Sequence, residues 1–111
     1  MKAEIRILGF DDSPFKKTDK TCRVIGTVMR ASGQIDGFIC FDVDIDGNNA
    51  TEMIIEKVKK SKFYRTLKAV MLDGIAFGGF NIVNINKVAR ELNKPVIVII
   101  RKMPNMKKVK D

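Results

Sequence analysis

The fold is decided by the stretch at residues 68–80, KAVMLDGIAFGGF. It opens with a short apolar segment, reaches a single acid at Asp73, and then passes through three glycines. A second apolar segment, PVIVII, lies at residues 95–100. Segments with no polar side are typical of parallel strands that are covered on both faces. We therefore expect both segments to be buried strands of an α/β domain, with Asp73 at the carboxyl end of the first.

The rest of the chain supplies further strands and two helices. Alternating and β-branched segments predict strands, and apolar residues at helical spacing predict helices. The expected elements are strands at 4–10, 21–30 and 37–45, a helix at 50–64, a strand at 68–72, a helix at 81–92 and a strand at 95–100. The hairpin would turn near Gly33, with candidate bulges at Gly26 and near Phe41. This β-β-β-α-β-α-β order is the ribonuclease H-like order, so we expect an α/β fold with a mixed five-stranded sheet and helices packed on it.

The composition limits the class of protein. The chain has 111 residues, which favours one domain at residues 1–101 followed by a basic tail at 102–111. Lysine and arginine total 21 against 13 aspartates and glutamates, and the net charge of +8 favours a polyanionic partner such as DNA. The lack of histidine excludes His-based acid–base catalysis and His-containing metal sites within this chain. No apolar run approaches the ~20 residues of a membrane-spanning helix, and the N-terminus lacks a signal-peptide pattern.

The two cysteines, Cys22 and Cys40, do not have the spacing of a metal-binding or redox pair. In the expected hairpin Cys40 would face residue 27 and Cys22 would face residue 45. They would not be cross-strand partners, so we do not expect a disulfide. Free cysteines commonly pack as small buried hydrophobes. We therefore expect reduced, strand-packed thiols and a cytoplasmic protein.

Two acids fall where the ribonuclease H-like order would bring strand ends together. Asp11 closes the first strand and Asp73 closes the fourth, and in this order the two strands are parallel neighbours about 4.8 Å apart. Both acids would then lie at the carboxyl edge, where open α/β sheets bind ligands. Glu52, early in the first helix, is the candidate for a third catalytic acid, and Asp12 and Asp46 are further candidate ligands. An all-oxygen site favours Mg²⁺ or Mn²⁺, which can activate a water and stabilise a leaving oxygen in phosphodiester hydrolysis.

Each of these acids also has a purely structural interpretation when it is taken alone. An Asp-Gly pair such as Asp73-Gly74 is common where a strand turns into a loop. Asp11 and Asp12 can order the loop that follows them through bonds to the backbone. Glu52 suits the first turn of a helix, close to the positive end of the helix dipole. The metal-site hypothesis therefore depends on the strand order that would bring the acids together.

Several residues are candidates for holding a nucleic acid. The basic stretch 57–65 can contact a phosphate backbone and offers an aromatic ring to a base, although such stretches are usually solvated helix surfaces. The glycine pair would directly precede the expected second helix, whose N-terminal N–H groups can receive a phosphate. The candidates are Lys57, Lys60, Phe63, Tyr64, Arg65, Gly78, Gly79 and Asn81. Of Phe77 and Phe80, which flank the glycines, we expect at least one in the core, and an exposed one is a candidate base wedge or stacking platform.

Several of these segments together resemble one known family. The segments are RILGFDDSPF, VIGTVMR, DGF, VDIDGNNATE and LDGIAFGGFNIVNI, and they resemble the archaeal endonuclease dU family over residues 5–101. That family is related to endonuclease V and has a ribonuclease H-like fold. The resemblance implies metal-dependent cleavage of DNA that carries a deaminated base, deoxyuridine especially. It places catalytic acids on Asp11 and Asp73, with Glu52 or Asp46 as the third.

The sequence departs from endonuclease V at one point. Endonuclease V has a histidine shortly after its Asp-Gly, where this chain has Ile75 and Ala76. Its base recognition and general-acid chemistry therefore do not carry over. Three hypotheses remain: a Mg²⁺- or Mn²⁺-dependent nuclease, a non-catalytic nucleic-acid-binding module whose acids are structural, and a small α/β domain whose glycine loop binds a phosphorylated small molecule.

Overall fold

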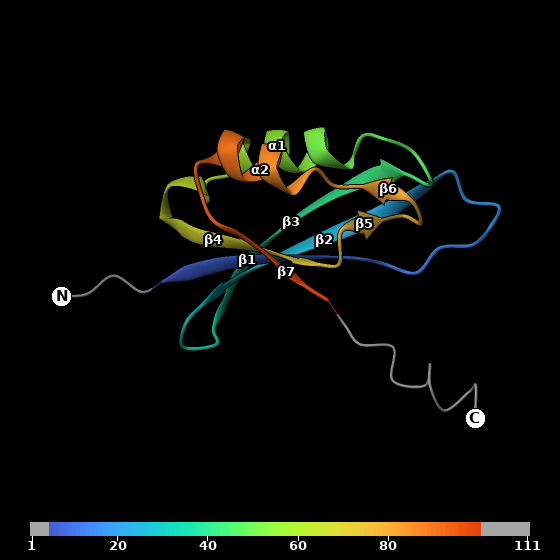
Figure 1. Cartoon of the computed structure of the whole chain (residues 1–111). Coiled ribbons are helices and arrows are strands. Elements are labelled where there is room, and N and C mark those ends of the chain that lie inside the picture. The colour runs from blue at the N-terminus through green and yellow to red at the C-terminus, as the bar shows by residue number, and fades with distance from the viewer. Residues whose placement is uncertain (1–4, 101–111) are drawn as a thin grey trace, which may run out of the picture.

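The computed structural model describes residues 5–100 of the chain. The basic tail predicted at 102–111 lies outside the described residues. Within them, no helix is long and apolar enough to cross a membrane. The elements are β1 (Arg6–Asp12), β2 (Thr21–Arg30), β3 (Ile35–Asp44), α1 (Ala50–Lys60), the short 3₁₀ turn η1 (Tyr64–Thr66), β4 (Leu67–Asp73), β5 (Ala76–Phe77), β6 (Asn81–Ile82), α2 (Ile85–Leu92) and β7 (Val96–Ile99) (Figure 1).

The main sheet has five strands in the order β3-β2-β1-β4-β7. β1 pairs with β4 in parallel and β4 pairs with β7 in parallel, whereas β2 is antiparallel to both of its neighbours. This confirms the mixed five-stranded sheet, the α/β class and the central pairing of the first and fourth strands. The small β5–β6 hairpin was not predicted. It occupies the start of the expected second helix, which begins at Ile85 rather than at residue 81.

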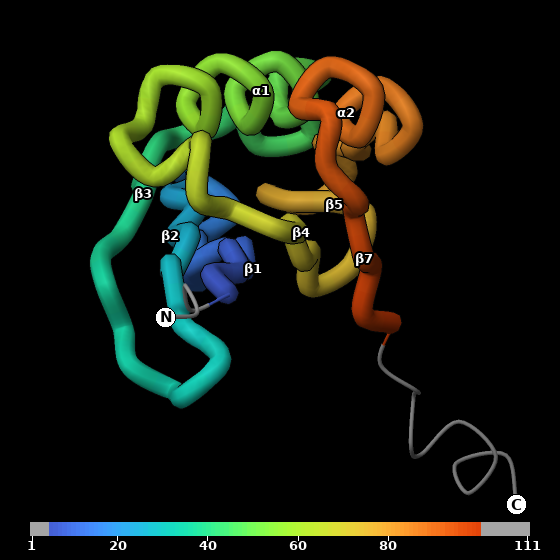
Figure 2. The backbone as a smooth tube through the Cα atoms, turned by 90° about the vertical axis from the view of Figure 1, so that its left-hand side faces the viewer, coloured from blue at the N-terminus to red at the C-terminus, as the bar shows by residue number. Residues whose placement is uncertain are grey.

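Both helices lie on the same side of the sheet (Figures 1 and 2). The chain moves in one direction across the sheet from β3 to β4 and from β4 to β7, so two right-handed crossovers put α1 and α2 on one face. The core lies between these helices and alternate residues of the strands. Its fully or almost fully buried strand residues include Leu8, Phe10, Val24, Val28, Phe41, Val43, Val70 and Leu72.

The opposite side of the sheet, the helix-free face, carries no helix of residues 5–100 (Figures 1 and 2). The expectation that the apolar strands β4 and β7 are covered on both faces is therefore wrong. Successive residues of a strand point to opposite faces, and on β7 Ile97 and Ile99 are 47% and 43% exposed. Ile25, Met29 and Phe38 lie on the same face and are also exposed. Because both crossovers have the same hand and direction, neither helix reaches this side.

The β2–β3 hairpin is more regular than predicted. Gly26 pairs with Phe10 and Ile39 without a bulge. Glycine suits this position because a Cβ there would lie 2.4 Å from the Phe10 ring. Phe41 also lies in unbroken pairing, and the irregularity falls between Val28 and Met29 instead.

The cysteine registers are each two residues away from those expected. Cys22 pairs with Val43 and Cys40 pairs with Ile25. Both thiols are free, as predicted, and Cys22 is buried. Cys40 is exposed on the helix-free face, so the prediction that it packs in the core is wrong.

Candidate functional site

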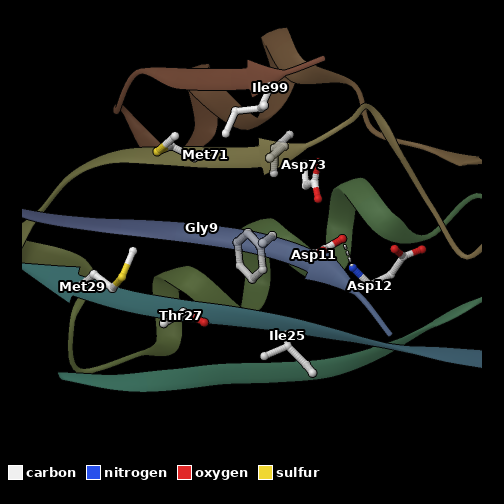
Figure 3. A pocket seen from close by; sticks show the side chains of 11 residues that line it. Gly9, Asp11, Asp12, Ile25, Thr27, Met29, Met71, Asp73 and Ile99 are labelled. Carbon is white, nitrogen blue, oxygen red and sulfur yellow. Dashed lines mark hydrogen bonds between the residues drawn. The ribbon is translucent and has the colours of Figure 1, made fainter. Parts of the chain in front are cut away.

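Asp11 and Asp73 lie side by side at the carboxyl edge of the sheet. The last paired residues of β1 and β4 are Phe10 and Leu72, so the next residue of each strand is one of the two acids. Phe10 and Leu72 point into the core, and the acids therefore point to the helix-free face. Figure 3 shows the two carboxyl groups at the ends of adjacent strands. The strand order thus brings together the two acids on which the metal-site hypothesis depends.

The electrostatics of the pair favour a bound cation. Partial burial raises the pKa of Asp11 above its usual value, and the neighbouring charge of Asp73 raises it further. The backbone N–H of Asp12 donates to Asp11 Oδ1 at 2.8 Å and opposes this rise. A divalent cation would relieve the repulsion between the two carboxylates. Mg²⁺ is commonly held by one or two carboxylates together with waters and substrate phosphates, so this donor set fits it.

The acid pair borders an open hollow of about 440 Å³ on the helix-free face (Figure 3). The sides of the hollow are mainly apolar and include Ile25, Met29 and Met71. Gly9 lies along one wall, and a Cβ there would meet nothing within 4 Å. The site therefore offers two acidic oxygen donors beside a shallow apolar surface.

Asp12 and Asp46, the other predicted metal ligands, hold the β5–β6 turn instead. Asp12 follows Asp11 and so points to the helix side, where its Oδ2 accepts from the N–H of Gly78 at 2.8 Å. Asp46 Oδ1 accepts from the N–H of Phe80 at 2.9 Å, and the Asp46 N–H donates to the Gly78 carbonyl. Both carboxylates thus serve as backbone anchors, and Asp12 holds this distant turn rather than the loop that follows it, which was the alternative interpretation.

Glu52, predicted as the third catalytic acid, is also held apart from the pair. Its side chain is 63% exposed on α1, and its Oε2 accepts from Lys87 Nζ. Within residues 5–100, no three aspartates, glutamates or cysteines gather closely enough to hold a metal ion. The structure therefore brings together two of the five predicted carboxylates and places the other three elsewhere.

The glycine loop does not supply the helix N-terminus that was predicted for phosphate binding. Gly78 and Gly79 have φ values of 57° and 82° and form the turn between β5 and β6. The N-terminus of α2 lies further along the chain at Asn84, whose side chain accepts from the N–H of Lys87. The prediction failed because the apolar residues after the glycines belong to a strand.

Asn81 has a role that the sequence analysis missed. It is fully buried, its Oδ1 accepts from the N–H of Ala50 at 2.9 Å, and its Nδ2 donates to the carbonyl of Asp44 and to Asn49 Oδ1. The side chain therefore satisfies the first N–H of α1 and joins the β5–β6 hairpin to the helix. The side chain of Asn49, the N-cap residue of α1, makes no capping bond of its own. The only hint of such a function in the sequence was the position of Asn81 two residues after the glycine pair.

The basic stretch lies at the other end of the sheet. Tyr64 and Arg65 directly precede β4, whose seven residues separate them from Asp73 by about 20 Å. Lys60 pairs with Glu56 at 3.0 Å. The Tyr64 hydroxyl donates to the carbonyl of Leu92 at 2.8 Å, so this ring is held against α2. Lys57 shares the last turn of α1 with Lys60. These candidates do not converge with the acid pair.

The sequence of the chain matches one family over almost its whole length. Residues 3–111 match the endonuclease dU family. The chain belongs to this family. A UPF0215 protein of Methanocaldococcus jannaschii is 48% identical over 98% of the chain and 59% of its own length, and one of Methanothermobacter thermautotrophicus is 44% identical over 99% and 54%. The chain thus spans little more than half the length of these endonuclease dU relatives, and the predicted resemblance is confirmed.

Solved structures give the same fold. A protein of unknown function from Archaeoglobus fulgidus superposes with a TM-score of 0.81 and is 42% identical, over 94% of this chain and 58% of that one. Endonuclease V of Ciona intestinalis, in complex with DNA that contains an inosine followed by a ribo-adenosine, gives a TM-score of 0.64 at 15% identity, over 88% and 46%. Human endonuclease V gives a TM-score of 0.63 at 12% identity, again over 88% of this chain and 46% of that one. This endonuclease dU chain therefore has an endonuclease V-like fold.

Proposed function

We propose that this chain is the core of a Mg²⁺- or Mn²⁺-dependent endonuclease that hydrolyses a phosphodiester bond in DNA carrying a deaminated base, deoxyuridine in the first place. The observation that carries the proposal is the juxtaposition of Asp11 and Asp73 at the carboxyl ends of neighbouring parallel strands. These two side chains would hold the metal. Family membership, the endonuclease V-like fold and the net charge of +8 support the choice of DNA as substrate.

In this proposal the metal ion and the side chains of the site have different roles. A bound divalent cation would activate a water and stabilise the developing charge on the leaving oxygen. The chain's own contribution is to fix two oxygen donors at the end of a rigid sheet. The Asp12 N–H orients Asp11 through the bond to Oδ1. Because the chain has no histidine, proton transfer cannot be assigned to an imidazole. A cytoplasmic location remains part of the proposal.

The second hypothesis is a nucleic-acid-binding module without catalysis. The observation that favours it is the pairing of Glu52 with Lys87, which leaves the site with two carboxylates from the described residues. Under this hypothesis the chain binds DNA through its positive charge, and binding weakens steeply with salt but needs no metal. The third hypothesis, a phosphate site at the glycine loop, loses its support because Gly78 does not precede a helix.

A cleavage assay tests the proposal. Single-stranded and duplex DNA with one deoxyuridine or one deoxyinosine is incubated with the protein and Mg²⁺ or Mn²⁺. Asp73→Asn is expected to lower the nicking rate by about 10³-fold or more, because loss of a metal ligand removes several kcal/mol of transition-state stabilisation. Asp42→Asn is the matched control, since Asp42 is an exposed acid that pairs with Arg23 away from the acid pair.

The outcomes separate the hypotheses. Metal-dependent nicking that disappears in Asp73→Asn and survives in Asp42→Asn supports the endonuclease. DNA binding without nicking at any metal concentration would refute catalysis by this chain and favour the binding module. Nicking that both variants retain would mean that the metal centre lies elsewhere.

A further inference from the structure

Phe80 is a solvent-exposed aromatic side chain, and it lies near the same edge of the sheet as the acid pair. It is 77% exposed, more than any other phenylalanine in the part of the chain that the structure describes. Its neighbour across the glycines, Phe77, is fully buried, so one of the pair packs in the core as predicted and the other does not. Ile82, two residues further along the chain and in β6, is 58% exposed. The β5–β6 hairpin therefore presents an apolar tip that the described fold does not use.

The tip is held in place by several hydrogen bonds. The N–H of Phe80 donates to Asp46, and the two hydrogen-bonding groups of the Gly78 backbone are bonded to Asp12 and Asp46. Gly79 has a positive φ, and a Cβ on it would lie 2.3 Å from Asp46 Oδ1. Asn81, which follows Phe80, is buried and hydrogen-bonded on both its oxygen and its nitrogen. The exposure of Phe80 is thus built into a fixed turn, and a preorganised contact binds with less loss of entropy.

Basic residues lie at the same end of the molecule as this tip. The loop between β1 and β2 carries Lys16, Lys17 and Lys20, all exposed. The end of this loop is bonded to the segment that holds the tip: the carbonyl of Lys20 accepts from the N–H of Ile45, and the next residue, Asp46, accepts from the N–H of Phe80. Figure 1 shows this loop at the same end of the molecule as β5 and β6. An exposed ring with lysines at the same end of a domain is the combination that binds a single strand, since the ring stacks on a base and the lysines attract its phosphates.

We propose that Phe80 is a stacking platform for an unpaired nucleobase of DNA, with the lysines of the β1–β2 loop holding the adjacent phosphates. The inference rests on the proposed function and adds to it a binding residue close to the acid edge. The carboxylate of Asp12 connects the two places, because it binds Gly78 and directly follows Asp11. Stacking needs only the flat face that every base presents, so Phe80 contributes affinity without choosing the base.

The chain has no tryptophan, which makes a direct test available. Phe80→Trp places a single indole at the tip, and Phe38→Trp places one on the helix-free face, where Phe38 is 60% exposed. Both are prepared with Asp73→Asn, so that DNA is not cleaved, and are titrated with oligothymidine in Mg²⁺. Stacking on a base is expected to quench the emission of Phe80→Trp saturably and to leave that of Phe38→Trp unchanged.

Affinity gives the second measurement. By fluorescence anisotropy of a labelled oligothymidine, Phe80→Ala is expected to weaken binding by roughly 5- to 100-fold and Phe38→Ala by less than about twofold. Phe80→Tyr keeps a ring and should bind like the parent, whereas Phe80→Leu keeps only the apolar character and should resemble Phe80→Ala. Thermal unfolding of each variant verifies that the fold is intact.

The results distinguish failure of this inference from failure of the proposed function. If oligothymidine binds and deaminated DNA is nicked, but Phe80→Trp emission is unchanged and Phe80→Ala binds normally, the platform is refuted and the nuclease stands. If Phe80→Leu binds as tightly as the parent, the tip is an apolar contact and base stacking is refuted. If no oligonucleotide binds to any form, both proposals fall.

Discussion

The two faces of the sheet are made by the same strands but differ in what covers them. On the helix side Leu8, Phe10 and their neighbours are buried under α1 and α2, and the acids on that side anchor backbone. On the helix-free face the side chains are also largely apolar but remain exposed, and the acid pair lies at the edge. Similar residue types thus have different uses on the two faces. Stability is concentrated on the covered face, and the groups suited to chemistry lie where water and a ligand can reach them.

The largest expected difference between the faces comes from cutting back an aliphatic side chain. Leu8→Ala removes a fully buried side chain and is expected to lower the free energy of unfolding by about 2–5 kcal/mol. Ile97→Ala, on a side chain that is 47% exposed, is expected to cost less than about 1.5 kcal/mol, because it removes only partly buried area. Urea denaturation of both variants checks the comparison. Equal losses would show that the helix-free face is covered in solution.

A smaller difference is expected from adding one methyl group at a glycine of each face. Gly26→Ala places a Cβ 2.4 Å from the Phe10 ring and is expected to cost about 1–3 kcal/mol through overpacking. Gly9→Ala meets no atom within 4 Å and Gly9 has no positive φ, so it is expected to be neutral or to stabilise by up to about 1 kcal/mol. Denaturant midpoints measure both. A destabilised Gly9→Ala would contradict the open hollow beside the acid pair.

The adjacent acids Asp11 and Asp12 should respond in opposite directions. Asp12→Ala removes the carboxylate that accepts from Gly78, and the loss is expected to be about 1–2 kcal/mol. Asp11→Asn removes a charge that burial and Asp73 disfavour, so it should raise Tm in a metal-free buffer. Scanning calorimetry with and without chelator makes the comparison. If Asp11→Asn lowers Tm without metal, the repulsion within the pair is absent.

The smallest expected effect, the rise in Tm caused by Asp11→Asn, should depend on pH. A raised pKa means that folded Asp11 holds its proton more tightly than the unfolded chain does, so the ionised carboxyl destabilises the metal-free fold. This penalty is present above the pKa of Asp11 in the folded protein and disappears as the pH falls through it. The Tm advantage of Asp11→Asn should therefore be largest at neutral pH and shrink on acidification.

The sequence was a good guide to elements whose pattern is local. Alternation along β2 and β3, the apolar runs of β4 and β7 and the helical spacing in α1 predicted the sheet and its order. The pairing of Asp11 with Asp73 followed from that order alone, because strand ends are fixed once neighbours are known. The family resemblance came from the same segments.

The errors arose where distant residues decide the local structure. The β5–β6 hairpin is fixed by Asp12 and Asp46, which lie far away in the chain, so the apolar residues after Gly79 looked helical. Glu52 is drawn to Lys87 of the other helix, which no local pattern indicates. The apolar run of β7 suggested burial on both sides, but which faces receive helices depends on the direction of two crossovers. A strand's composition does not encode that direction.

The Asp11-Asp12 dipeptide straddles the plane of the sheet, one carboxylate on each side. Because side chains alternate strictly along β1, inserting or deleting one residue before the dipeptide would exchange the two faces. An insertion would move Asp11 to the position that anchors the hairpin, and a deletion would move Asp12 to the position that faces Asp73. The two adjacent acids thus make both the acid pair and the anchoring of the β5–β6 turn depend on the register of β1. Length variation should be tolerated in the loop after Asp12 and excluded within the strand before it.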